Sequence, residues 1–253
     1  MEKKHVAWSN NCRGEVSVVY EKYQGPSLLG DLNFVDISVS ASERVFVLST
    51  NGEYTNLDAG ESRIPSNWER FNVILPGGIN INKIDASPKN IIYAVLSDGT
   101  LGKIAVSNNE GKLKVIKGVE GVTQVSAAPD GLVWVVATNG DGSEVKFYNG
   151  KKWTNVPGIE HAMRVTGTEG GQAYVVRGNG EISLVSAKGI VKKIPFSHNP
   201  TELSVGPDGT LWAIAQNQDF TGGTVYTTNN QGTKWSQVEG ADAKYLDAGL
   251  LID

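Results

Sequence analysis

The chain has 253 residues, of which 40% are hydrophobic and 20% are charged, and its formal net charge is −4 at pH 7. This composition is typical of a globular protein, and the acidic excess excludes the basic surface that binding to a nucleic-acid backbone requires. The one cysteine, Cys12, excludes an intrachain disulfide.

The first segment, MEKKHVAWSNN, contains two lysines without an apolar run behind them. We therefore expect no signal peptide. The chain also has no stretch near the roughly 18 apolar residues that a membrane-spanning helix needs, so we expect no membrane insertion. The expected location is the cytoplasm, or outside the cell by secretion without a signal peptide.

The sequence contains a unit that recurs along the chain. In each of five units an apolar anchor is followed, nine residues later, by an aromatic residue. The anchors are Ile37, Ile84, Val125, Val165 and Leu203, and the aromatic residues are Phe46, Tyr93, Trp134, Tyr174 and Trp212. A glycine turn and a further strand come after each aromatic residue, and a last strand often opens on tryptophan. Each unit therefore predicts four short antiparallel strands in about 40 residues, which is typical of a propeller blade.

A sixth unit is divided between the two ends of the sequence. Leu246 begins it shortly before Asp253, and Trp8, Gly14 and the segment VSVVY supply its remaining strands at the N-terminus. The sequence thus predicts an all-β fold: a six-bladed β-propeller of four-stranded antiparallel blades, closed by sharing one blade between the N- and C-termini. We expect residues 1–253 to form one domain of six repeats, each of about 42 residues. A β-sandwich with coincidental turns is the alternative.

The repeated aromatic residues are expected to fill the wedges between blades rather than to bind a ligand, because the strands around them are apolar on both faces. Two connecting loops appear longer than the others, Asn139–Ser143 and Asn217–Gly223. They are candidates for binding, with Asp141, Asp219 and Phe220 at their tips. The segment Thr228–Trp235 is similar to an Asp-box, a hairpin motif with a structural role.

The segments WTNVPG, WSQVEG, PDGLVWVV and PDGTLWAI together resemble the repeat of the tectonin family, which includes tachylectin-1 and the fish-egg lectins. The resemblance covers essentially the whole chain, although KVIKG and IVKKIP replace the leading tryptophan in two units. It implies a six-bladed propeller that acts as a multivalent, non-catalytic lectin of innate defence, with glycans on microbial or cell surfaces as partners. The candidate glycan-binding residues are Trp68, Trp153, Trp235, Asn155, Gln237, Tyr148, Asp219 and Phe220.

Two other functions stay open. One is a protein-interaction propeller without a sugar ligand. The other is a sialidase-like hydrolase, suggested by the Asp-box and by the segment SRIP at Ser62–Pro65, but opposed by the small number of arginines and by the position of SRIP. The three histidines, His5, His161 and His198, are far apart and indicate neither a catalytic triad nor a zinc site. We expect no catalytic residues, no metal and no cofactor, and the sequence leaves the oligomeric state open.

Overall fold

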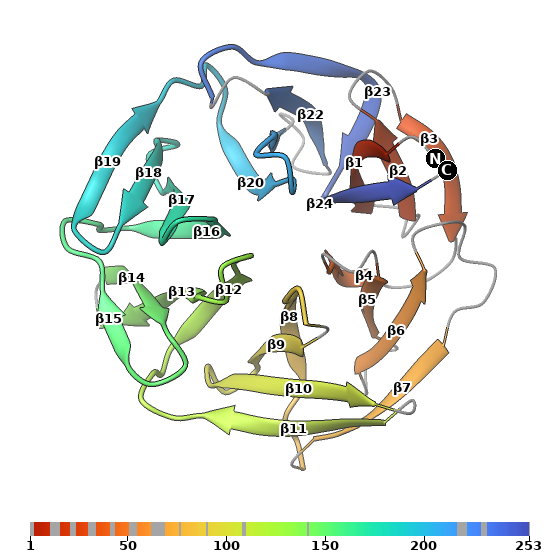
Figure 1. Ribbon diagram of the computed structural model, residues 1–253, viewed down its shortest axis with the longest axis vertical. Helices are drawn as coiled ribbons and strands as arrows, with labels where there is room; N and C mark the ends of the chain where they lie inside the picture. The colour runs from red at the N-terminus through yellow and green to blue at the C-terminus, as the bar shows by residue number, and fades with distance from the viewer. Residues whose placement is uncertain are drawn as a thin grey trace.

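The computed structural model is built from β-strands arranged in a ring around a central axis (Figure 1). No helix is present in the residues that it describes, and none there is long and apolar enough to cross a membrane. The described residues are 3–10, 16–20, 24–29, 34–40, 44–50, 55–61, 69–75, 77–89, 91–107, 110–140, 142–216, 222–228 and 232–252.

The two ends of the chain lie in one sheet, with the spatial order β24-β1-β2-β3. Its strands are β1 (Lys3–Asn10), β2 (Val16–Tyr20), β3 (Gln24–Leu29) and β24 (Tyr245–Ile252). Strand β24 pairs antiparallel with β1 along its full length, from Tyr245 opposite Asn10 to Ile252 opposite Lys3. Figure 1 shows the two termini side by side.

Three further sheets each contain four strands in sequence order, and every pairing in them is antiparallel. The first contains β12 (Val122–Ala127), β13 (Val133–Asn139), β14 (Gly142–Tyr148) and β15 (Trp153–Asn155). The second contains β16 (Ala162–Thr168), β17 (Gln172–Arg177), β18 (Ile182–Ser186) and β19 (Gly189–Ile194). The third contains β20 (Pro200–Val205), β21 (Leu211–Gln216), β22 (Gly223–Thr228) and β23 (Ser236–Ala243).

The remaining sheet has eight strands, in the order β4-β5-β6-β7-β11-β10-β9-β8. Its strands are β4 (Phe34–Val39), β5 (Arg44–Thr50), β6 (Thr55–Glu61), β7 (Glu69–Ile74), β8 (Ile81–Ala86), β9 (Ile91–Leu96), β10 (Leu101–Ser107) and β11 (Glu110–Ile116). The prediction of six separate blades is wrong in this region, because the described strands form five sheets. The cause is a parallel pairing of two outer strands, with Asn72, Val73 and Ile74 of β7 opposite Glu110, Gly111 and Lys112 of β11.

The innermost strands contact one another in a complete circuit around the axis. Strand β24 contacts β4, β4 contacts β8, and the contacts continue through β12, β16 and β20 back to β24. Five of these strands have a β-bulge at the same place, two residues before the anchor, as between Val122 and Gln124 of β12. Bulges increase the local twist of a strand, so the shared bulge gives the innermost strands a common bend.

The core lies in the wedges between successive four-stranded units. In the wedges whose side chains are described, the aromatic residue of one unit packs near the anchor of the next, as Trp134 does with Val165 and Trp212 with Leu246. Trp134 and Trp212 are completely buried, and burying such side chains is the largest favourable term in folding. The expectation that the repeated aromatic residues fill the wedges is confirmed for Phe46, Trp134, Tyr174 and Trp212. The side chain of Trp8 is not among those that the structure describes.

One of the two predicted long loops is absent. Strands β13 and β14 continue until Asn139 pairs with Gly142, which leaves a short turn. Residue Asp141 and the second loop, 217–221, lie outside the described residues.

Gly121 lies directly before β12, where the chain passes very close to the neighbouring strand β13, and substituting it has a predictable cost. It has a φ of 65°, and a Cβ atom there would overlap the carbonyl oxygen of Thr138. Gly131 has a φ of 86° but open space around its Cα. We expect Gly121→Ala to lower the free energy of unfolding by about 3 kcal/mol, and Gly131→Ala by only about 1 kcal/mol, because only the first adds a steric clash to the left-handed conformation. Chemical denaturation of both variants measures the difference, and equal losses would contradict the close approach.

Candidate functional site

Two rings of polar side chains surround the central axis. Successive residues of a strand point to opposite faces, so the residues on both sides of each buried anchor face away from the wedge and toward the axis. The residues after the anchors form the hydroxyl–acid ring: Ser38, Asp85, Ser126, Thr166, Ser204 and Asp247. The residues before the anchors form the charged ring: Asp36, Lys83, Gln124, Arg164, Glu202 and Tyr245.

The hydroxyl–acid ring joins each innermost strand to the next by the same hydrogen bond. A side-chain oxygen of one strand accepts a bond from a backbone N–H of the following strand, as Ser126 Oγ does from Gly167 at 2.9 Å. Five such bonds are present around the axis, and their donors are Ala86 to Ser38, Ala127 to Asp85, Gly167 to Ser126, Ala248 to Ser204 and Val39 to Asp247. The ring therefore fixes the innermost strands against one another.

Ser38 lies between the two carboxylates of this ring. Its Oγ is 2.8 Å from Asp85 Oδ1 and 3.1 Å from Asp247 Oδ2, while it accepts the N–H of Ala86. A hydroxyl has one proton to donate, so it satisfies only one carboxylate at a time. The second contact is a hydrogen bond only when the other carboxyl group is protonated and donates to Ser38.

The pKa values of both groups agree with a retained proton. Burial, and then the neighbouring charge of Asp85, raise the pKa of Asp247 to about 8, against hydrogen bonds from Ser204, Val39 and Ser38. Burial also raises the pKa of Asp85, and the hydrogen bonds from Ala127 and Ser38 oppose it only in part. At neutral pH the pair holds a proton that an exposed pair of aspartates would have released.

The charged ring lies on the opposite side of the anchors from the hydroxyl–acid ring. Ion pairs between innermost strands hold it together. Lys83 Nζ lies 3.4 Å from Asp36 Oδ1 and 3.6 Å from Glu202 Oε2, and Arg164 Nε lies 3.2 Å from Glu202 Oε1. Burial raises the pKa of Asp36 to about 6, although Lys83 opposes this. Burial disfavours the charge of Lys83, but Asp36 and Glu202 outweigh it and hold the pKa of Lys83 above its usual value. Lys83 Nζ also lies 4.5 Å from the ring centre of Tyr245.

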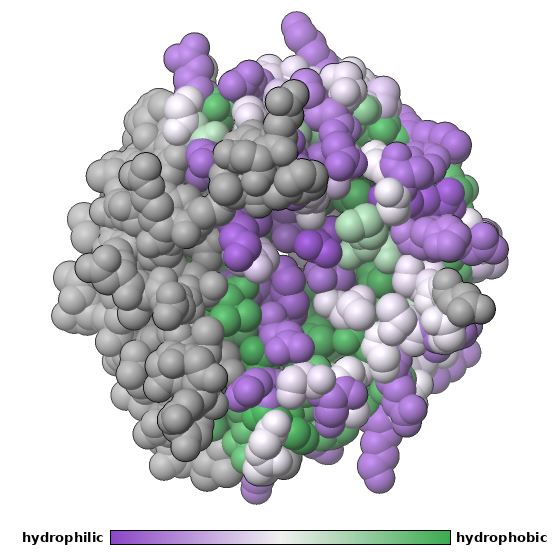
Figure 2. Space-filling model, turned by 180° about the vertical axis from the view of Figure 1, so that it is seen from behind, coloured by the Kyte–Doolittle hydropathy of each residue, from purple (hydrophilic) through white to green (hydrophobic). Residues whose placement is uncertain are grey.

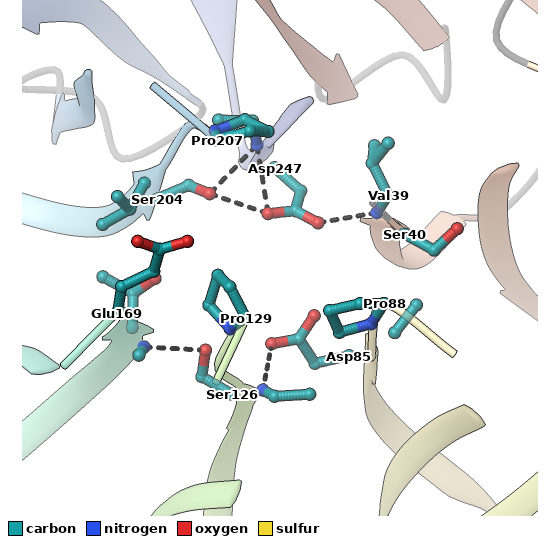
Figure 3. Close-up of a pocket in the computed structure, with 16 residues that line it drawn as sticks. Val39, Ser40, Asp85, Pro88, Ser126, Pro129, Glu169, Ser204, Pro207 and Asp247 are labelled. Atoms are coloured by element: carbon teal, nitrogen blue, oxygen red, sulfur yellow. Dashed lines mark hydrogen bonds between the residues drawn. The ribbon is translucent and has the colours of Figure 1, made fainter. Parts of the chain in front are cut away.

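A cavity of about 190 Å³ opens at the end of the axis next to the hydroxyl–acid ring, and we call it the mouth cavity. Asp85, Ser126, Thr166, Ser204 and Asp247 line it, and Figure 3 shows Asp85, Ser126, Ser204 and Asp247 in the hydrogen bonds described above. Pro88, Pro129, Pro207 and Glu169 also line it, and each belongs to the turn that follows an innermost strand. Figure 2 shows the molecule from the side opposite to Figure 1, where hydrophilic side chains gather around a central hollow.

The predicted glycan-binding residues that the structure describes lie away from the axis, on or next to the outer strands. Tyr148 and Trp153 are brought together, with ring centres 5.1 Å apart, and Asn155 on the same strand as Trp153 donates to Glu144 at 3.1 Å. Trp235 directly precedes β23 and Gln237 lies in it, in a different sheet from Trp153. Trp68, Asp219 and Phe220 lie outside the described residues. Glycan binding by this set stays a prediction.

Trp153 and Trp235 make the same contact with the preceding four-stranded unit. The indole N–H of Trp153 donates to the carbonyl of Lys117 at 3.0 Å, and that of Trp235 donates to the carbonyl of Pro195 at 3.0 Å. Both rings are half-buried against neighbouring side chains, Trp235 against Phe196 at 4.7 Å between ring centres. Each tryptophan therefore fastens the outer strand of one unit to the end of the previous one.

This fastening gives a test on Trp153. We expect Trp153→Ala to lower the free energy of unfolding by about 2–3 kcal/mol, because it removes a packed ring and a hydrogen bond. Trp153→Phe keeps most of the packing and should cost about 1 kcal/mol. Urea denaturation gives both values, and an alanine variant as stable as the parent chain would show that the ring is free for other contacts.

Sequence reasoning missed both axial rings, although the chain contained a signal for them. The residue after each of the six anchors is Ser, Asp or Thr, and five of the six residues before them are charged or carry an amide. In the part of the chain that the structure describes, no cluster of three or more His, Cys, Asp or Glu side chains has the arrangement of a metal site.

Comparison with known proteins identifies a fold rather than a family. No protein-family model matches the sequence, and no curated protein matches it. Among solved structures, a putative TolB from Agrobacterium tumefaciens is similar over 99% of both chains, with 15% identity and a TM-score of 0.65. YCF48 bound to a D1 peptide matches over 92% of this chain and 78% of its own, with 13% identity and a TM-score of 0.54. The fold is that of a β-propeller.

A third similar structure is PorZ, an essential bacterial surface component of the type-IX secretion system of Porphyromonas gingivalis. It has 18% identity and a TM-score of 0.54. The match covers 94% of this chain but 32% of PorZ, so the chain spans about a third of that protein. At these identities the likeness supports the fold alone. It does not support membership of the tectonin family.

Proposed function

We propose that this chain is a non-catalytic protein-interaction propeller that binds a segment of a partner protein over the mouth cavity. The observation that carries the proposal is the cavity itself, which has half-buried carboxylates and buried hydroxyl-bearing residues at its floor and proline-bearing turns at its edge. Concave sites with apolar walls and a few convergent polar groups are the usual places for ligands.

The charge around the cavity indicates the kind of segment. Among the described residues of the surrounding turns, Asp130, Glu169 and Asp208 are acidic and exposed, while Lys89 is the one basic residue. With Asp85 and Asp247 below them, these residues give the face an acidic character. A complementary partner segment is therefore basic, since opposite potentials favour association and its rate.

We also propose that the ring has six blades, with β4–β7 and β8–β11 counted as two. Each of these groups spans one sequence repeat, and each contributes one innermost strand to the circuit around the axis. On this count the parallel contact between β7 and β11 joins the outer edges of two blades. It protects two strand edges that would otherwise be free to pair with other chains.

The lectin function that the tectonin resemblance implies has less support. The indole N–H groups of Trp153 and Trp235 are already used in hydrogen bonds within the molecule, and their rings are half-buried. The similar structures offer one example of peptide binding, YCF48 with its D1 peptide. An array of glycans distinguishes the two functions, since the interaction propeller should not bind it.

A selection from a library of random peptides tests the proposal. We expect folded protein to enrich basic peptides and expect Glu169→Lys, at the edge of the mouth cavity, to weaken their binding about threefold to tenfold. Glu160→Lys is the matched control, because Glu160 is also exposed and lies at the opposite end of β16 from Glu169. Equal effects of the two variants, or enrichment of no peptide, would overturn the proposal.

A further inference from the structure

The mouth cavity has a polar floor and an apolar wall. Asp85, Asp247 and Thr166 contribute polar groups beside the axis, and Val39, Ala86, Ala127, Val205 and Ala248, together with three prolines, supply apolar surface above and between them. This arrangement suits a side chain with an apolar stem and a charged end, because such side chains bury the stem and keep the charge among polar groups.

Thr166 is the member of the hydroxyl–acid ring whose side-chain oxygen accepts no hydrogen bond from a backbone N–H of the next strand. Its side chain is 92% buried, with 8% exposed, and it lines the cavity. Its hydroxyl has no hydrogen-bond partner among the residues that the structure describes. The hydroxyl oxygen is not among the fully enclosed polar atoms that lack a partner, so it is open to the cavity and can bond to a group that enters there.

Within the described part of the chain, neither Asp85 nor Asp247 forms an ion pair with a lysine or arginine. The cations of the charged ring, Lys83 and Arg164, form ion pairs with Asp36 and Glu202. Asp85 and Asp247 face Ser38 and backbone N–H groups instead. A cation in the mouth cavity would replace the shared proton and remove the repulsion between the two carboxylates.

The donors and acceptors present favour an ammonium group over a metal ion. Asp85 and Asp247 are the anionic groups at the floor, with Glu169 at the edge, and each of the four oxygens of the floor carboxylates already accepts a hydrogen bond from the protein. Metal ions such as calcium need six or more oxygen ligands in close coordination. An ammonium group donates three hydrogen bonds, which can be shared between the carboxylates and the Thr166 hydroxyl. The guanidinium of arginine is less suitable, because its planar fork needs a free carboxylate edge.

We propose that the mouth cavity recognises a primary ammonium group of the partner segment, carried by a lysine side chain or by a chain N-terminus. The inference rests on the proposed function and specifies which group of the partner enters the axis. The stem of the group lies against the prolines, and its nitrogen lies between Asp85, Asp247 and Thr166.

Binding is coupled to proton release. The titratable and charged groups around the site are Asp85 on β8, Asp247 on β24 and Glu169 after β16, with Lys89 on a neighbouring turn and Asp36, Lys83, Arg164, Glu202 and Tyr245 in the ring beyond the anchors. The ammonium group binds best when both cavity carboxylates are ionised. Affinity therefore rises as the pH passes through about 8, the pKa of Asp247, and the shared proton is lost.

The first test uses a peptide selected on the folded chain, with its N-terminus acetylated or free and each lysine replaced in turn by norleucine. We expect one replacement or the acetylation to weaken binding by about tenfold or more, because it removes a charged donor from a buried carboxylate pair. Which change has this effect identifies the source of the ammonium group. Peptides that bind equally well after every change would overturn the inference and leave the proposed function intact.

Two protein variants complete the test. Thr166→Val removes an unpaired hydroxyl, so the variant should be as stable as the parent chain and yet bind the peptide about threefold to tenfold more weakly. Asp247→Asn should weaken binding further and reduce its pH dependence. Displacement of the peptide by millimolar calcium or magnesium, with both carboxylates required, would overturn the ammonium assignment in favour of a metal ion. An unchanged affinity in Thr166→Val would remove that residue from the site and overturn the geometry proposed here.

Discussion

Deletion of residues 245–253, which removes β24, is expected to abolish cooperative folding. Strand β24 pairs with β1 over eight residues, and its Leu246 and Ala248 pack against Trp212 in the wedge with β21. It also contacts β4 and β20 and carries Asp247, which accepts hydrogen bonds from Val39 and Ser204. The combined loss exceeds the roughly 5–15 kcal/mol that typically stabilises a domain. A shortened chain should therefore show no cooperative thermal transition by calorimetry.

A synthetic peptide with the sequence of residues 243–253 provides the control for this deletion. Added to the shortened chain, it should restore a thermal transition whose midpoint rises with peptide concentration, because it binds only the folded state. A scrambled peptide of the same composition should not. A shortened chain that melts cooperatively without peptide would show that β24 is dispensable and that the circuit of innermost strands is not needed for stability.

The periodic part of the fold could be predicted from the sequence because it depends on local spacing. The nine-residue interval places the aromatic residue of one unit in the wedge with the next anchor, as Trp134 and Val165 show. The parallel pairing of β7 with β11 has no such signal. This pairing depends on how far the two outer strands extend. The alternation of apolar and polar residues along a strand does not indicate which other strand its outer edge will pair with.

The candidate site was missed for a different physical reason. Tryptophans such as Trp153 attracted the binding hypothesis because exposed aromatic residues often contact sugars, but in the structure this ring fastens two units together. The residues beside the anchors, such as Asp85 and Asp247, look like ordinary polar positions in half-exposed strands. Only the closure of the ring brings residues 162 positions apart to one hydroxyl, that of Ser38.

The free energy of unfolding is expected to fall as pH rises from about 5 to about 9. Burial raises the pKa of Asp247 to about 8 and that of Asp36 to about 6, and also raises that of Asp85. The folded chain therefore keeps protons that the unfolded chain releases near pH 4. Their stabilising contribution is fully present below pH 4 and is lost as pH rises through the folded pKa values. Each retained proton gives a slope of about 1.4 kcal/mol per pH unit.

Asp247→Asn assigns this slope to one side chain. The amide mimics the protonated acid and cannot ionise, so the variant should lose about one hydrogen bond, near 1 kcal/mol, and show a flatter decline above about pH 6. Asp98→Asn is the matched control: a hydrogen bond from the exposed Thr100 hydroxyl lowers the pKa of Asp98, so this group titrates below the measured range. Urea denaturation at a series of pH values gives both profiles. A parent-like slope in Asp247→Asn would place the retained proton on Asp85 or Asp36 and would contradict the assignment of that proton to Asp247.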